Sequence, residues 1–127
     1  MLNNRSPISG TATFEENVLS EEIVIEKYVK AFLDVVILAM LNGEATYGYK
    51  IIAVIHKEFG ILLSPASLYP LLHRLENNKL IESNLGEGGK TTYCLTPKGK
   101  ETFNRKFAAY NLSNQIMRSF IKTHARI

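Results

Sequence analysis

The stretch SPASLYPLLHRLE, residues Ser64–Glu76, decides the fold of this protein. Ser64 followed by Pro65 is a typical helix start, because serine caps free amide groups and proline fits the first helical position. The apolar positions that follow recur at spacings of three and four: Leu68, Leu71, Leu72 and Leu75. This pattern predicts a short amphipathic helix that ends at Asn77-Asn78 and buries one side.

The opposite side of this helix is mostly small or polar. At 100° per residue it presents four residues outward, with three more on the flanks: Ala66, Pro70, His73 and Asn77, then Ser67, Tyr69 and Arg74. A DNA major groove accepts a helix whose leading face is slim and polar. Pro70 lacks the N–H that would bond to the Ala66 carbonyl, so it either marks a broken helix or shapes the first half for insertion into a groove.

The neighbouring segments complete a recognisable set of elements. One or two helices are expected between Phe14 and Gly43. Another is expected from Thr46, as its N-cap, to Phe59-Gly60, with Tyr49, Ile52, Ile55 and Phe59 on one side. Residues 80–83 and 91–95 are short, rich in strand formers and joined by turn residues, which predicts a β-hairpin. The predicted fold class is mainly α with a small β-hairpin wing, a winged helix-turn-helix with an N-terminal extension.

A long C-terminal helix is expected from about Lys98 to Ile127, because Thr96-Pro97 repeats the start signal. Its larger side chains alternate steps of four and three, a pattern typical of a helix that packs lengthwise on another. The residues are Phe103, Phe107, Tyr110, Asn114, Met117 and Ile121. They predict the contact of a homodimer, with Asn114 as a polar element that fixes the register.

Charge is distributed unevenly along the 127 residues. The formal net charge is +3, but residues 1–26 hold one arginine and five glutamates, whereas residues 27–127 hold fourteen Lys and Arg against seven Asp and Glu. A basic body favours a polyanionic partner. We predict a flexible leader over 1–13, a winged-helix domain with a helical extension over 14–97, and a dimerisation helix over 98–127.

Several other classes are excluded by the residues. The segment GEGGKT has Asn84 where a phosphate-binding loop needs glycine, and it joins two strands instead of opening a helix. The single cysteine, Cys94, forms no internal disulfide and reads as a small strand residue. Histidines 56, 73 and 124 lack metal spacing, so neither a metal, a cofactor nor catalysis is expected. Because no apolar run can span a bilayer and no signal peptide is visible, we expect a cytoplasmic protein without membrane contact.

The segments FLDVVILAML, TYGYKII, LLSPASLYPLLHRLENNKLIES and TYCLTPKGK, which lie within about residues 28–107, resemble the PadR family of transcriptional regulators. The resemblance implies a dimeric winged-helix DNA binder, often a repressor released by a small aromatic or drug-like effector. By position it assigns Ser67, Tyr69, Pro70 and Arg74 to the recognition-helix motif and Tyr47-Gly48-Tyr49 to the motif of the preceding helix. The chain departs from the family in lacking tryptophan and in its acidic N-terminal extension.

The predicted partner is therefore double-stranded DNA with an inverted-repeat operator, bound by a homodimer. The predicted DNA-binding residues are Ser64, Ala66, Ser67, Tyr69, Pro70, His73, Arg74 and Lys90. The serines and Tyr69 suit phosphate oxygens, His73 and Arg74 suit base edges, and Lys90 suits the sugar-phosphate backbone beneath the wing. Tyr69 can equally pack against the preceding helix. The alternative function is a dimeric winged-helix module that binds another protein, because the fold alone does not decide between them.

Overall fold

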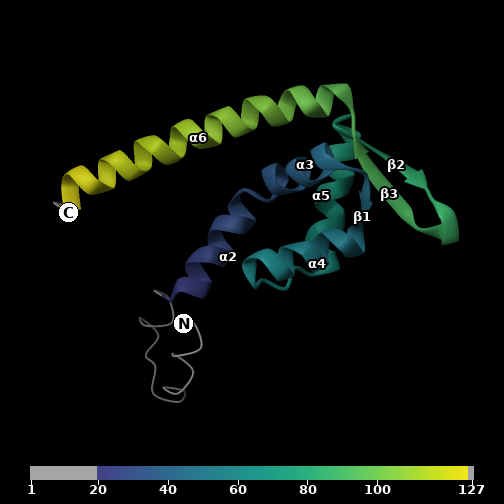
Figure 1. The fold of residues 1–127 in the computed structure, drawn as a ribbon, viewed down its shortest axis with the longest axis horizontal. Helices are drawn as coiled ribbons and strands as arrows, with labels where there is room; N and C mark the ends of the chain where they lie inside the picture. The colour runs from purple at the N-terminus through teal and green to yellow at the C-terminus, as the bar shows by residue number, and fades with distance from the viewer. Residues whose placement is uncertain (1–19, 126–127) are drawn as a thin grey trace, which may run out of the picture.

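The computed structural model describes residues 20–125, which form a group of helices with one small sheet at one end (Figure 1). In chain order the elements are α2 (Glu21–Ala31), α3 (Leu33–Gly43), β1 (Thr46–Tyr47), α4 (Gly48–Phe59), α5 (Pro65–Asn77), β2 (Ile81–Leu85), a 3₁₀ turn (Glu87–Gly89), β3 (Thr91–Leu95) and α6 (Pro97–Ala125). The predicted fold class, mainly α with a β-hairpin wing, is confirmed. Within residues 20–125 no helix combines the length and the apolar character that crossing a bilayer requires.

Helix α5 has the predicted start and the predicted buried side. The Ser64 hydroxyl oxygen accepts a hydrogen bond from the Ser67 amide at 3.2 Å, which caps the helix. The four leucines of the stripe are all buried, and the side chains of Leu68 and Leu72 are almost wholly enclosed. The helix continues through Pro70, so the interpretation of this proline as a helix break is wrong.

The core lies between α5, the helices that precede it and the first residue of the wing. Its largest fully buried side chains are Ile37, Leu38, Ile51, Ile55, Leu68, Leu72 and Ile81. They come from α3, α4, α5 and β2, so four elements share one apolar interior. Burial of these aliphatic side chains is the main favourable free energy that holds α5 in place.

The start of α4 differs from the expectation. Thr46 is not an N-cap: it belongs to β1, is buried and lies opposite Tyr93 of β3, and the helix begins at Gly48. A β-branched threonine suits a strand position that pairs with a neighbour. The predicted face of α4 is also wrong in part, because Ile51 and Ile55 are buried while the side chain of Tyr49 is 75% exposed. Gly60 ends the helix in the left-handed conformation, as expected.

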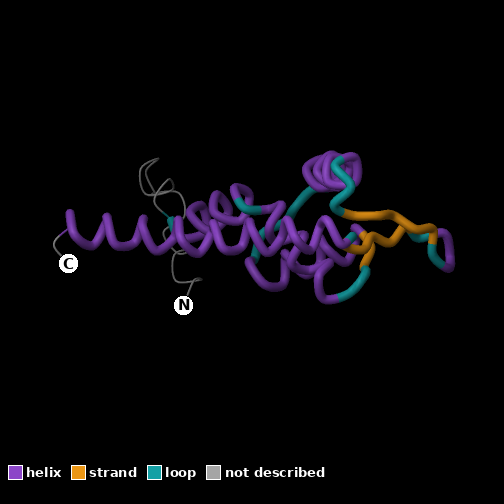
Figure 2. Tube along the Cα trace, turned by 90° about the horizontal axis from the view of Figure 1, so that it is seen from above, coloured by secondary structure: helices purple, strands orange, loops and turns teal. Residues whose placement is uncertain are grey.

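The wing is the predicted hairpin with one additional strand. The order in the sheet is β1-β3-β2, and both pairings are antiparallel, with Ile81 opposite Leu95. Cys94 lies in β3 and is half-buried, which confirms it as a strand residue. The hairpin leaves the body at one end of the molecule, and the C-terminal half of α6 leaves it at the other (Figures 1 and 2).

The described residues up to Gly43 form two helices, α2 and α3, which is one of the two expected arrangements. Helices α2 and α3 meet at Phe32, whose backbone is non-helical. The expected helical residues from Phe14 to Leu19 and the expected leader over 1–13 lie outside the described residues. Lys106 of α6 forms an ion pair with Asp34 of α3 at 3.0 Å, which ties the last helix to the core.

The end of α5 is joined to the start of α6 by a network around Thr96. The Thr96 hydroxyl donates to the Lys79 carbonyl at 2.6 Å and accepts from the Gly99 amide at 2.9 Å, while the Thr96 amide donates to the Leu80 carbonyl. Thr96 is thus the N-cap of α6, and Pro97 is the first helical residue, as the sequence predicts. Gly99 packs directly on the Leu80 backbone, where a side chain has no space.

Helix α6 also contacts α2 through a chain of hydroxyl groups. The Tyr110 hydroxyl donates to the Tyr28 hydroxyl at 3.1 Å, and the Tyr28 hydroxyl donates to the side-chain oxygen of Asn114 at 3.3 Å. The Phe32 ring meets the Tyr110 ring edge to face, with centroids 4.9 Å apart. The hydrogen bond to Tyr28, followed by partial burial, raises the pKa of Tyr110 above its ordinary value of 10.0.

Replacing Gly99 with Ala is expected to destabilise the fold by about 2 kcal/mol, because the added Cβ would lie 2.9 Å from the Leu80 carbonyl carbon and overlap the carbonyl oxygen. Urea unfolding measures the effect. Gly43→Ala is the matched control, because nothing lies within 4 Å of its Cβ and alanine favours the end of α3. Equal stabilities of the two variants would contradict the close contact.

Tyr28→Phe is expected to return the pKa of Tyr110 toward 10, because the variant lacks the oxygen that accepts the Tyr110 proton. The raised pKa belongs to the folded state. The protonated Tyr110 hydroxyl therefore stabilises the fold below pH 10, and this stabilisation is lost as the pH rises through the folded-state pKa. NMR titration of tyrosine labelled at Cζ measures it. Tyr49→Phe, at an exposed residue, should leave the Tyr110 titration unchanged.

Candidate nucleic-acid interface

The outer face of α5 is open to solvent along its length. Ala66, Pro70 and His73 are all exposed, because the leucine side of the helix is turned into the core. Ser64 and Ser67 stand at the helix start, where their hydroxyl groups are joined by a hydrogen bond of 3.1 Å. This end of the helix presents the two hydroxyl groups and the positive end of the helix dipole, which suit an anion.

A cavity of about 380 Å³ lies between α5, the start of α4 and the wing. It brings together two of the predicted DNA-binding residues, Tyr69 and Lys90. The Lys90 ammonium nitrogen lies 4.5 Å from the centroid of the Tyr47 ring, a cation–π distance. Its lining is Tyr47, Gly48, Tyr49, Tyr69, Lys90, Thr91 and Tyr93. Hydroxyl and ammonium groups thus gather beside α5, on the side of the wing.

Tyr69 packs against the preceding helix, one of the two roles expected for it. Its ring lies over Gly48, where an added Cβ would come within 2.8 Å of the ring carbon that bears the hydroxyl. Its side chain is also partly exposed, so the hydroxyl borders the cavity. Glycine at 48 therefore permits a tyrosine at 69. Burial, followed by the charges of Tyr69 and Glu76, raises the pKa of the adjacent Tyr93, which stays a neutral donor at ordinary pH.

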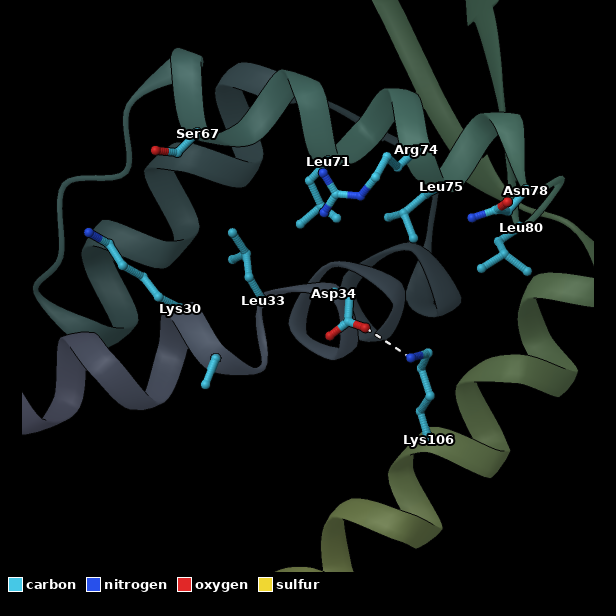
Figure 3. A pocket seen from close by; sticks show the side chains of 11 residues that line it. Lys30, Leu33, Asp34, Ser67, Leu71, Arg74, Leu75, Asn78, Leu80 and Lys106 are labelled. Atoms are coloured by element: carbon cyan, nitrogen blue, oxygen red, sulfur yellow. Dashed lines mark ion pairs between the residues drawn. The ribbon is translucent and has the colours of Figure 1, made fainter.

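Arg74 lies on the opposite flank of α5, away from Lys90. It borders a second cavity, of about 450 Å³, formed with α2, α3 and α6 (Figure 3). Lys30, which forms an ion pair with Glu26 at 2.9 Å, and the ion pair of Asp34 with Lys106 line the same cavity. Among residues 20–125 no cluster of histidine, cysteine and carboxylate side chains is arranged to hold a metal ion.

Two exposed side chains beside the helix start were missed by the sequence reasoning. Tyr49 and Leu62 are 75% and 80% exposed and border a largely apolar groove with Ser64 and Pro65. The segment TYGYK was noted as a motif, but Tyr49 was placed on the apolar side of its helix. Since Tyr49 precedes the buried position 51 by only two residues, it points elsewhere.

The residues predicted for dimerisation divide into two sets. Phe103 packs against the core, and Tyr110 and Asn114 contact Tyr28 of the same chain. These three are therefore occupied, at least in part, within one subunit. The others are largely exposed, with values of 46% for Phe107, 58% for Met117 and 49% for Ile121.

A second apolar row on α6 was not predicted. Leu112, Ile116 and Phe120 follow one another at spacings of four and are 57%, 59% and 59% exposed. Together with Met117 and Ile121 they give the C-terminal half of α6 an apolar surface that this chain does not cover. We call this set of five residues the distal surface of α6. The sequence analysis missed this row because it followed a single stripe of side chains along α6, in which the steps alternate between four and three residues.

Solved structures share this fold. A transcriptional regulator from Clostridium thermocellum is 28% identical, with a TM-score of 0.69 over 76% of this chain and 99% of that one. A PadR-like transcriptional regulator from Bacillus cereus is 27% identical, with a TM-score of 0.68 over 76% and 97%. A PadR family regulator from Eggerthella lenta, 23% identical, supports the fold with a TM-score of 0.77 over 88% and 99%.

A curated relative from Streptomyces fradiae, described as an uncharacterized 37.1 kDa protein in transposon TN4556, is 34% identical over 86 residues. The match covers 67% of this chain but only 25% of the relative, so the chain spans about a quarter of that protein's length. The model of the transcriptional regulator PadR-like family matches residues 37–105, from α3 through the wing into α6. That is more than half of the chain, and the protein belongs to the PadR-like family of transcriptional regulators.

Proposed function

We propose that this transcriptional regulator is a homodimeric repressor that binds an inverted-repeat operator in double-stranded DNA. Helix α5 enters the major groove, and the wing follows the backbone or the minor groove. The observation that carries the proposal is the exposure of Ala66, Pro70 and His73 on a helix whose other side is buried in its own subunit. The family consists of transcriptional regulators, and the chain is not an enzyme.

The proposed roles follow from the position of each side chain. The Ser64 and Ser67 hydroxyls and the positive end of the helix dipole suit one phosphate, and Tyr69 with Lys90 suits another on the side of the wing. His73 lies on the leading face and suits a base edge. Arg74, turned toward α2 and α6, suits a base or phosphate farther along the groove.

The proposed dimer pairs the distal surfaces of two α6 helices. The five side chains of the distal surface are each about half exposed or more, and a run of exposed apolar side chains of this kind marks an interaction site: Leu112, Ile116, Met117, Phe120 and Ile121. A two-fold arrangement then places two α5 helices in successive major grooves, about 34 Å apart. This geometry requires an operator with inverted-repeat symmetry.

Duplexes selected by the protein from a random library are expected to contain an inverted repeat and to bind with a steep salt dependence. Lys90→Gln should lower the log–log salt slope by about 0.9, because one phosphate contact is lost. Lys122→Gln, at the far end of α6, is the control and should leave the slope unchanged. Failure to enrich any duplex would instead favour the protein-binding module, and an unchanged slope in Lys90→Gln would remove the wing from the interface.

The double variant Ile116→Glu with Phe120→Glu is expected to be monomeric in sedimentation equilibrium, because it places two charges on the distal surface. Its affinity for the full inverted repeat should fall to that for a half-site. The matched control is Asn111→Glu with Gln115→Glu, which has the same spacing and charge on another side of α6. A dimer in the first variant, or a monomer in the unmodified protein, would disprove this contact.

A further inference from the structure

The proline within α5 changes what the outer face offers to a ligand. Proline has no N–H, so the Ala66 carbonyl cannot accept the helical hydrogen bond that residue 70 would otherwise donate. The helix nevertheless runs unbroken from Pro65 to Asn77, and both Ala66 and Pro70 are exposed. A carbonyl acceptor without its helical donor therefore lies beside an apolar pyrrolidine ring, on the face that is turned away from the core.

This combination occurs only in the first half of the face. Ala66 and Pro70 are apolar and small, whereas His73, one turn later, is polar. The Ser64 cap fixes the helix start, and the buried Leu68 fixes its rotation, so these groups are held rigidly. A rigid surface with one acceptor and one apolar patch can distinguish base pairs, because each pair shows its own pattern in the major groove.

An A·T pair has the complementary pattern. In the major groove thymine presents a methyl group and adenine presents an amino group that donates hydrogen bonds. A guanine in place of the adenine would set its O6 acceptor against the Ala66 carbonyl, and a cytosine in place of the thymine would lack the methyl group. The surface formed by Ala66 and Pro70 thus matches A·T and disfavours G·C.

We propose that Ala66 and Pro70 form a reader of one A·T base pair in each operator half-site. The thymine methyl group packs on the Ala66 side chain and the Pro70 ring, and the adenine amino group donates to the Ala66 carbonyl. This inference rests on the proposed function, because it requires α5 to lie in a major groove. It gives Pro70 a part in sequence specificity beyond that of shaping the helix.

The test uses base analogues in a duplex that the protein itself selects from a random library. In each half-site every thymine is replaced in turn by deoxyuridine, which lacks only the methyl group, and every adenine by 2′-deoxynebularine, which lacks only the amino group. The unmodified protein should lose about fourfold in affinity at one thymine. It should lose about fivefold when the adenine paired with that thymine is replaced.

Pro70→Ala supplies the decisive comparison. Alanine restores an N–H that bonds to the Ala66 carbonyl and removes the ring, while favouring the helical fold. The variant should bind the selected duplex but lose the fivefold penalty for 2′-deoxynebularine and most of the penalty for deoxyuridine. Pro65→Ala is the matched control, because Pro65 is the first helical residue and lies outside the face of Ala66 and Pro70, so both penalties should remain.

The outcomes separate this inference from the proposed function. If the unmodified protein selects no duplex, the proposed function is disproved, and the reader is disproved with it. If it binds a duplex in which no A·T pair is sensitive to both analogues, the reader is disproved while DNA binding stands. Equal penalties in Pro70→Ala and the unmodified protein would also disprove it, because another group must then read that pair.

Discussion

Burial of the leucine side of α5 is the constraint on which the rest of the structure depends. Leu68 and Leu72 are buried with almost no exposure in the core that α5 shares with α3, α4 and β2, and this fixes the rotation of the helix about its axis. Once the rotation is fixed, the helical period determines that Ala66, Pro70 and His73 point outward and that Tyr69 and Arg74 occupy opposite flanks. The outer surface is a direct consequence of how the inner one packs.

The junction around Thr96 transmits that placement to the last helix. Its hydroxyl joins the Lys79 carbonyl to the Gly99 amide, so the residues after α5 and the first turn of α6 are held together. Gly99 allows the two backbones to touch, and the ion pair of Asp34 with Lys106 adds a second attachment. The direction of α6 relative to α5 is therefore set by contacts within a single subunit.

Much of this arrangement was predictable because its signals are local. Ser64, Pro65 and the leucine spacing define α5 without reference to the rest of the chain, and Thr96 with Pro97 does the same for α6. The two-residue strand β1 was not predictable, since Thr46 and Tyr47 become a strand only by pairing with β3. The exposure of Tyr49 and the contact of Tyr110 with Tyr28 also depend on tertiary packing, which the spacing of apolar residues within one helix does not predict.

The division of α6 into a covered and an uncovered half gives the helix two mechanical roles. Contacts within the subunit hold the first part of α6 on the winged domain. They come from Phe103, Tyr110 and Asn114. The C-terminal half of α6 projects from the body as a lever that carries the distal surface (Figure 2). Because α6 is joined through Thr96 to the residues that follow α5, a change in how two distal surfaces meet in the proposed dimer would alter the separation of the two α5 helices. In the proposed dimer, a signal that acts on the pairing of the α6 helices would therefore change the separation of the two α5 helices without changing the fold of either winged domain.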